Sequence, residues 1–167
     1  DETREFDLAG KQWLKDGFYR PEAKGALAWK DIDHVYAYTD FGAGSMTASG
    51  YPRIAKLWRR GTPLDSADTL YQGSDDDMYI AAYRDHSKGF ARDFVSRTIA
   101  FYNDELYRIG ADGALAKIDV PNSAQKNVHK RHLLLELRDS WTAAGTTYPA
   151  GALIAADFEV FMAGGRD

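Results

Sequence analysis

Short runs of alternating apolar and polar residues recur along the chain, separated by turn-forming residues. Residues 25–29 form an apolar run typical of a buried strand, and the pattern resumes at 34–39 after a polar turn. These two runs predict a β-hairpin. Residues 53–60 alternate charged with apolar side chains, which predicts a strand with one solvated face. Residues 69–71 predict a fourth strand before Gly73.

The same pattern then repeats in the middle of the chain. Four further strands are predicted at 78–83, 94–102, 105–109 and 115–120. Residues 25–73 and 76–120 therefore each offer four strands in a unit of roughly 45–50 residues, which matches a propeller blade. We expect an all-β fold, a partial β-propeller with about two full four-stranded antiparallel blades plus parts of two others.

The two ends of the chain look like incomplete blades. Residues 1–24 are expected to form the end of a preceding blade and a connector. Residues 121–167 are expected to form an incomplete blade in a single partial propeller over 1–167. Within this last part we predict strands at 131–137 and 151–158, a turn at 145–149 and a short helix at 157–162.

A partial ring exposes strand edges and apolar blade faces, and both favour self-association of the chain. A pair of such pieces could approximate a closed ring by two-fold pairing. The residues expected on the inter-blade surfaces are Leu27, Trp29, Tyr36, Ile80, Ile99, Phe101, Leu133 and Leu135.

Composition and charge exclude several classes of protein. The 44% hydrophobic and 28% charged residues argue against wholesale disorder. A net charge of -4 is opposite to the basic footprint of a nucleic-acid-binding protein. No apolar run approaches the ~20 residues of a membrane span, and no signal peptide is visible in this segment. Cysteine is absent, so thiolate metal sites and cysteine nucleophiles are excluded, while the compartment stays undetermined.

The chain carries no recognisable catalytic, cofactor or metal motif. No serine stands in a Gly-x-Ser-x-Gly elbow. His129 and His132 are three residues apart, where side chains of a single strand face opposite ways. The acidic run 75–77 lacks the spaced ligands of a calcium loop and is interpreted as an inter-blade turn. We therefore assign no catalytic, cofactor-binding or metal-binding residue.

The segment 40–52 is a Gly- and Ser-rich loop, which we expect to be mobile or shaped by contacts at one face of the propeller. It lacks the Gly-Lys-Ser/Thr ending of a phosphate-binding loop. The basic residues that follow it favour a solvated face, or a surface that steers acidic peptide groups. They are Arg53, Lys56, Arg59 and Arg60.

The stretch 39–64 contains TDFGAGSMTASGYPR followed by LWRRGTPL. Supporting strings lie at 4–8, 21–24, 92–97, 117–121 and 133–138. Over essentially its whole length the chain resembles the propeller of prolyl oligopeptidase-family serine peptidases. Ala43 departs from this pattern, which has proline there.

The resemblance implies a two-domain parent enzyme. A hydrolase domain, absent from this chain, would carry a Ser-Asp-His triad, and a seven-bladed propeller would restrict entry to short peptides. The partners implied are that hydrolase domain and, in the parent, short peptide substrates; no nucleic acid, membrane or cofactor is implied. This chain alone is expected not to be an enzyme. Candidates for an interdomain or gating loop are Asp40, Phe41, Ser45, Tyr51 and Arg53.

Two other functions are considered beside this one. A stand-alone β-rich module could bind peptides or carbohydrates through exposed Tyr and Trp side chains, which are abundant at 10 and 4 residues. A small hydrolase could use a pair of aspartates, although no pair stands out in the sequence.

Overall fold

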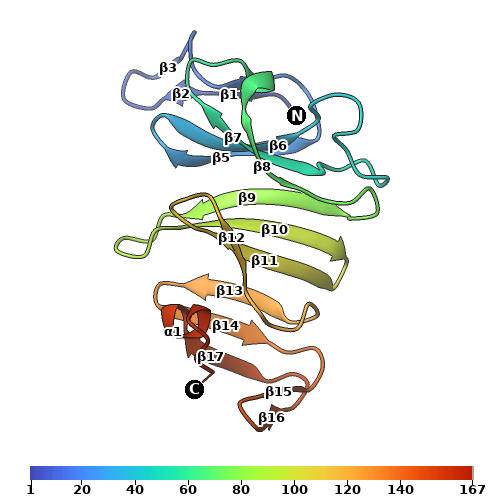
Figure 1. The fold of residues 1–167 in the computed structure, drawn as a ribbon. Helices are drawn as coiled ribbons and strands as arrows, with labels where there is room; N and C mark the ends of the chain where they lie inside the picture. The colour runs from blue at the N-terminus through green and yellow to red at the C-terminus, as the bar shows by residue number, and fades with distance from the viewer. Residues whose placement is uncertain (167) are drawn as a thin grey trace.

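The computed structural model describes residues 1–166, which form antiparallel strands and one short α-helix. Three sheets follow one another along the chain and stack in sequence order (Figure 1). The first sheet consists of β5 (Gly25–Asp31), β6 (His34–Thr39), β7 (Ile54–Arg59) and β8 (Asp68–Gln72), in that order. Each strand pairs with its neighbour in the sequence, as in a propeller blade.

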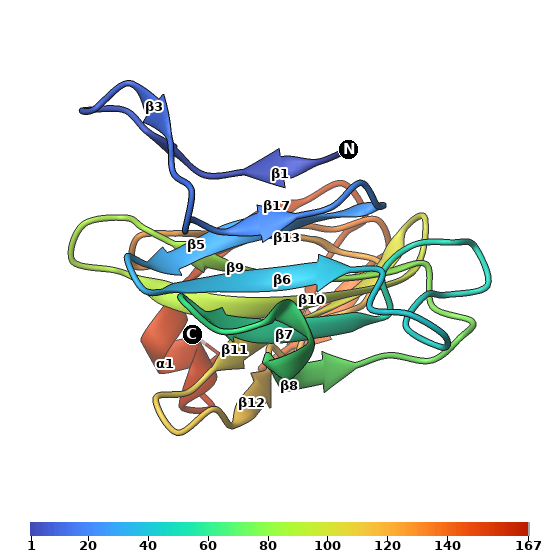
Figure 2. The same ribbon diagram turned by 90° about the horizontal axis from the view of Figure 1, so that it is seen from above.

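The second sheet repeats this arrangement with β9 (Tyr79–Asp85), β10 (Arg92–Ala100), β11 (Asn103–Ile109) and β12 (Leu115–Lys117). The third sheet contains β13 (Gln125–His129), β14 (His132–Glu136) and β17 (Leu153–Asp157). A hairpin of β15 (Trp141–Ala143) and β16 (Thr146–Tyr148) is inserted between β14 and β17, and α1 (Phe158–Met162) follows. Seen from above, β5, β9 and β13 lie toward one side and β8 and β12 toward the other (Figure 2).

Short ribbons precede the first sheet. β1 (Thr3–Arg4) pairs with β4 (Tyr19–Arg20), and β2 (Phe6–Asp7) pairs with β3 (Gln12–Trp13). The hairpin of β2 and β3 stands away from the stacked sheets (Figure 2). A 3-10 turn, η1 (Leu64–Ser66), connects β7 to β8.

Apolar side chains fill the spaces between the sheets. Between the first and second sheets, Tyr36 and Ala55 meet Ile80, Ala82 and Val95. Several of these side chains are small, so the two sheets approach closely at this point. This packing buries one face of each sheet and supplies the main stabilising free energy between them.

The second core lies between the second and third sheets. Phe94 and Leu106 meet Leu133 and Leu135, and Phe158 of α1 closes the cluster edge-to-face against Phe94 at 6.0 Å. α1 begins at Asp157, whose side chain accepts hydrogen bonds from the backbone N–H groups of residues 159 and 160. The sheets are thus packed face to face, and the predicted all-β, partial-propeller fold is confirmed.

Strand β6 shows how packing between layers is reflected in the pattern of apolar residues. Val35 and Ala37 face the N-terminal segment, where they pack with Phe18 and with Trp58 of β7. Tyr36 faces the second sheet instead. Both faces of β6 are therefore buried, which explains a nearly continuous apolar run where a half-exposed strand would alternate.

Some expectations about the last part of the chain are wrong. The strand at 125–129 was not predicted, because its Gln, Lys, Asn and His residues hide the apolar signal. Residues 146–148 form β16, although a turn was expected at 145–149; the turn itself lies at Ala144 and Gly145, both of positive φ. Asp167, the end of the expected range 121–167, lies outside the described residues.

The expected inter-blade residues divide into three groups. Leu27 and Ile99 are half-buried, and Leu27 packs against the cluster that contains Phe18. Tyr36, Ile80, Leu133 and Leu135 lie between sheets as predicted, covered within this same chain. Trp29 and Phe101 are exposed, at 45% and 84%. Phe101 occupies the tight turn between β10 and β11, where no neighbouring sheet covers it.

Within residues 1–166, no strand pairs with the outer edge of the third sheet. β17 pairs with β14 on one side. The bonds Leu137 N to Ala152 O and Phe158 N to Arg131 O show that even-numbered residues of β17 face β14. The backbone groups of Leu153 and Ala155 therefore point away from the sheet.

Candidate functional site

The loop between β6 and β7 lies at one end of the stacked sheets, on the same side as the β10–β11 turn (Figure 1). Its first half is a compact turn organised by Ser45. The Ser45 hydroxyl donates to Gly42 O at 2.7 Å and accepts from the Phe41 N–H at 2.8 Å. Asp40 accepts from the Gly42 N–H at 2.8 Å. Gly42 has a φ of 103°, which an L side chain adopts only with strain.

Arg53 holds this turn against the rest of the molecule. Its Nε donates to Gly44 O at 3.0 Å, and a terminal nitrogen donates to Gly73 O at 3.4 Å. The guanidinium also pairs with Asp75 at 3.0 Å. A single side chain therefore ties the loop to the connection between β8 and β9.

The second half of the loop is likewise anchored. Thr47 and Ser45 are buried, and the Ala48 N–H donates to Asp75 O at 2.8 Å. The sequence predicts that 40–52 is either mobile or shaped by contacts, and these hydrogen bonds show that contacts shape it.

Three tyrosines form an edge-to-face cluster beside the loop. Tyr79 lies 5.9 Å from Tyr38 and 5.8 Å from Tyr51, and the Lys24 ammonium lies 4.5 Å from the Tyr51 ring centre. Burial raises the pKa of Tyr79 to about 12 and also raises the pKa of Tyr38, so both phenols stay neutral at physiological pH. Tyr51 is 45% exposed and forms the outer member of the cluster. The sequence did not indicate this cluster, because its members come from three separate segments.

The five predicted loop residues thus fall into two groups. Asp40, Phe41 and Ser45 meet in the turn, and Arg53 reaches it at Gly44. Tyr51 belongs instead to the tyrosine cluster. Phe41 is covered by the Lys56 ammonium at 4.5 Å from its ring centre.

A partly buried ionic network lies in the second sheet near the same end. Asp77 accepts from Arg97 Nε at 3.0 Å, and Arg97 also donates to Glu105 at 3.2 Å. Glu105 accepts further from Lys117 and from the Tyr107 hydroxyl, both at 2.6 Å. Burial alone would raise the pKa of Glu105, but the bonds from Lys117 and Tyr107 and the nearby charges lower it to about 2. We call Asp77, Arg97, Glu105, Tyr107 and Lys117 the Glu105 network.

Residues 75–77 lie in the connection between the first and second sheets, as the interpretation of an inter-blade turn predicts, but Asp77 is also part of the network. Asp77 is 3% exposed and also accepts from the Ser74 N–H at 2.7 Å. Its partner Arg97 lies 20 residues away in the sequence. Local sequence therefore gave no sign that the third aspartate is buried and paired.

The basic run after the loop is not one solvated face. Arg60 forms a two-pronged ion pair with Glu5, with both N–O distances at 2.9 Å, and its guanidinium lies 4.7 Å from the Phe18 ring centre. Arg53 is occupied by the loop contacts described above. Only Arg59 is exposed in the way that the sequence predicted.

His129 and His132 do not face opposite ways as predicted, because they lie on two strands. A two-residue turn joins β13 to β14 and places the two histidines directly opposite each other. Both are exposed. Within residues 1–166, no group of three or more His, Asp or Glu side chains could hold a metal ion. Across the same residues, no helix is long and apolar enough to cross a membrane.

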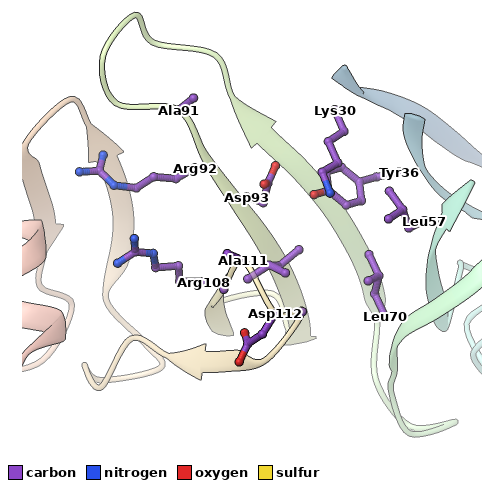
Figure 3. A pocket seen from close by; sticks show the side chains of 13 residues that line it. Lys30, Tyr36, Leu57, Leu70, Ala91, Arg92, Asp93, Arg108, Ala111 and Asp112 are labelled. Atoms are coloured by element: carbon purple, nitrogen blue, oxygen red, sulfur yellow. The ribbon is translucent and has the colours of Figure 1, made fainter. Parts of the chain in front are cut away.

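A cleft of about 540 Å³ opens between the first and second sheets at the end opposite the loop (Figure 3). Tyr36 and Leu57 line one wall, and Asp93 lies on the other. Arg92 and Arg108 border the cleft but point away from it (Figure 3), and both bind Glu159, at 3.0 and 2.7 Å. The sequence did not indicate this cleft, because it depends on the spacing between two sheets.

Comparison with known proteins shows that this chain is related to peptidases. An uncharacterized peptidase of Sinorhizobium fredii is 32% identical to 98% of this chain, and one of Rickettsia prowazekii is 25% identical to 93% of it. The chain is homologous to a segment of these peptidases. It spans about a quarter of their length, 23% in each case. No protein-family profile matches the chain.

A solved structure of a peptidase also contains a segment with the fold of this chain. A post-proline cleaving enzyme from Rickettsia typhi superposes with a TM-score of 0.86 over 96% of this chain and 25% of its own, at 24% identity. The predicted resemblance to a segment of a peptidase is confirmed, and this peptidase homologue has the fold of the corresponding segment of that enzyme.

Proposed function

We propose that this peptidase homologue is part of the propeller of a prolyl oligopeptidase-family serine peptidase and carries no catalytic residue itself. The observation that carries the proposal is the coverage: the chain aligns almost completely, yet with only a quarter of each peptidase. The sequence also lacks a Gly-x-Ser-x-Gly elbow. The chemistry would then belong to a hydrolase domain in the rest of the parent chain.

Within this proposal, residues 25–73 and 76–120 are two blades, with 1–24 and 121–167 belonging to the blades on either side. Their role is steric, because stacked blades limit the size of the peptide that reaches the hydrolase domain. The loop 40–52 would contact that domain. Its internal hydrogen bonds and the Arg53 clamp support this role, since a preorganised loop loses little conformational entropy when it docks.

The first experiment tests for catalysis. The purified chain is incubated with a chromogenic peptide that contains proline, and we expect no turnover above buffer. Turnover that survives repurification and persists in every column fraction containing the chain would contradict a non-catalytic role.

The second experiment tests gating in the parent peptidase. Tyr51→Ala in the exposed part of the tyrosine cluster is compared with Ile32→Ala, which removes a 73% exposed side chain at the opposite end of the sheet. We expect Tyr51→Ala to change the ratio of cleavage rates for long and short peptides, whereas Ile32→Ala leaves it unchanged. Equal ratios for both variants and the wild type would argue against gating by this loop.

A further inference from the structure

The connecting segment, residues 73–78, joins β8 to β9 and is bound by both of the first two sheets. It lies beside the loop 40–52 at the same end of the stack (Figure 1). On the side of the first sheet, the Ala48 N–H of the loop donates to Asp75 O at 2.8 Å. The guanidinium of Arg53 holds the same segment, as described above. Backbone groups of the connecting segment therefore form the surface on which the loop rests.

On the side of the second sheet, the Asp77 carboxylate fixes the shape of the connecting segment. It accepts from the Ser74 N–H at 2.7 Å and from Arg97, whose Nε lies 3.0 Å from both carboxylate oxygens. The carboxylate also lies close to the backbone of Gly73, because a Cβ placed there would be 2.6 Å from Asp77 Oδ2. The segment that receives the loop is thus built around this one carboxylate.

Arg97 acts on the segment without touching the loop. Within residues 1–166, its guanidinium binds Asp77 and Glu105, and no loop atom is among its hydrogen-bond or ion-pair partners. The Asp77 side chain is only 2% exposed, so the charge of its carboxylate depends on Arg97 for compensation. Without Arg97 the carboxylate must turn toward water, and the segment that carries the acceptor of the Ala48 N–H must move with it.

We propose that the Asp77–Arg97 ion pair positions the loop 40–52 by holding the connecting segment in the shape on which the loop rests. The conformation of a loop in the first sheet then depends on an ion pair of the second, and the connecting segment is the element that both share. Asp77 and Arg97 are positioning residues in this proposal. It does not depend on the proposed function, because every contact in it lies within this chain.

The test measures hydrogen exchange of backbone amides in the purified chain by NMR. The Ala48 amide reports on the contact between loop and connecting segment, and the Leu137 amide, bonded to Ala152 O at 2.9 Å, reports on the distant third sheet. Arg97→Met should raise the ratio of the Ala48 exchange rate to the Leu137 rate about tenfold. A general loss of stability would speed both amides alike and leave the ratio unchanged.

Arg108→Met is the matched control. It removes another guanidinium of the second sheet, which binds Glu159 at 2.7 Å and not the connecting segment, and it should leave the ratio unchanged. Asp77→Asn keeps an acceptor for the Ser74 N–H and removes only the charge, so it should raise the ratio in the same direction as Arg97→Met. This variant decides the question if Arg97→Met does not fold.

A double-mutant cycle tests whether the two arginines act through the same segment. Arg53→Met and Arg97→Met should each raise the Ala48 exchange rate about tenfold, and the double variant should stay near tenfold, because the loss of either clamp already releases the segment. Rates that multiply to about a hundredfold would mean that the arginines act independently and would overturn the proposal. An unchanged ratio in Asp77→Asn would also overturn it.

Discussion

Replacing Glu105 by Gln removes the carboxylate charge at the centre of the Glu105 network while keeping the shape of the side chain. Glu105 is 8% exposed and accepts hydrogen bonds from Arg97, Lys117 and Tyr107. Glutamine is neutral and cannot balance the charges of Arg97 and Lys117. Its amide NH₂ is also a donor, and it would face other donors at a position where the carboxylate has an accepting oxygen. We expect clear destabilisation, because the change removes the charge-assisted hydrogen bonds that Glu105 accepts from the partly buried Arg97 and Lys117.

The magnitude follows from the lowered pKa. A shift from 4.5 to about 2 corresponds to roughly 3 kcal/mol of stabilisation when the group is ionised. The folded-state pKa is depressed, so this contribution is complete well above pH 4.5 and is lost as the pH falls through 2. By pH 3 about 2 kcal/mol of it should be gone.

Urea unfolding of the wild type and Glu105→Gln at pH 7 and pH 3 measures this contribution. The difference in unfolding free energy should be about 3 kcal/mol at pH 7 and near 1 kcal/mol at pH 3. Glu136→Gln, at an exposed position of β14, is the control and should change little at either pH. A Glu105→Gln difference below about 1 kcal/mol at pH 7, or one that stays constant with pH, would refute the reasoning.

Two further predictions concern the loop and the open edge. Arg53→Met removes the hydrogen bonds to Gly44 and Gly73 and should speed hydrogen exchange of the Ser45 amide about tenfold. Arg59→Met, at an exposed position, is the control and should leave this exchange rate unchanged. Equal exchange rates in the two variants would show that Arg53 does not hold the loop. The chain should self-associate through the free edge of β17, as measured by sedimentation equilibrium. Ala155→Pro removes a backbone N–H that points away from the sheet and should weaken the association. Phe101→Ser, in the β10–β11 turn, is the control and should not weaken it. A wild-type chain that stays monomeric at high concentration would refute self-association.

The Glu105 network and the cleft show why parts of the site escaped prediction. Asp77 and Arg97 are 20 residues apart, and the two walls of the cleft come from different sheets. Hydrophobic periodicity reports only which face of a strand is buried, and it carries no information on which distant side chain lies opposite. Similarly, the polar residues of β13 hid a strand that exists because β14 pairs with it.

The sequence by itself determined the strands of the first two sheets, their order and the all-β class, because alternation and turn residues act locally along the chain. The resemblance carried by residues 39–64 likewise needed no coordinates. Only the tertiary structure decided which charges are paired: Arg60 reaches Glu5 across 55 residues, and Arg97 reaches Asp77 across 20. The physical reason is that an ion pair depends on distances of a few ångströms between side chains, and stacking whole sheets sets those distances.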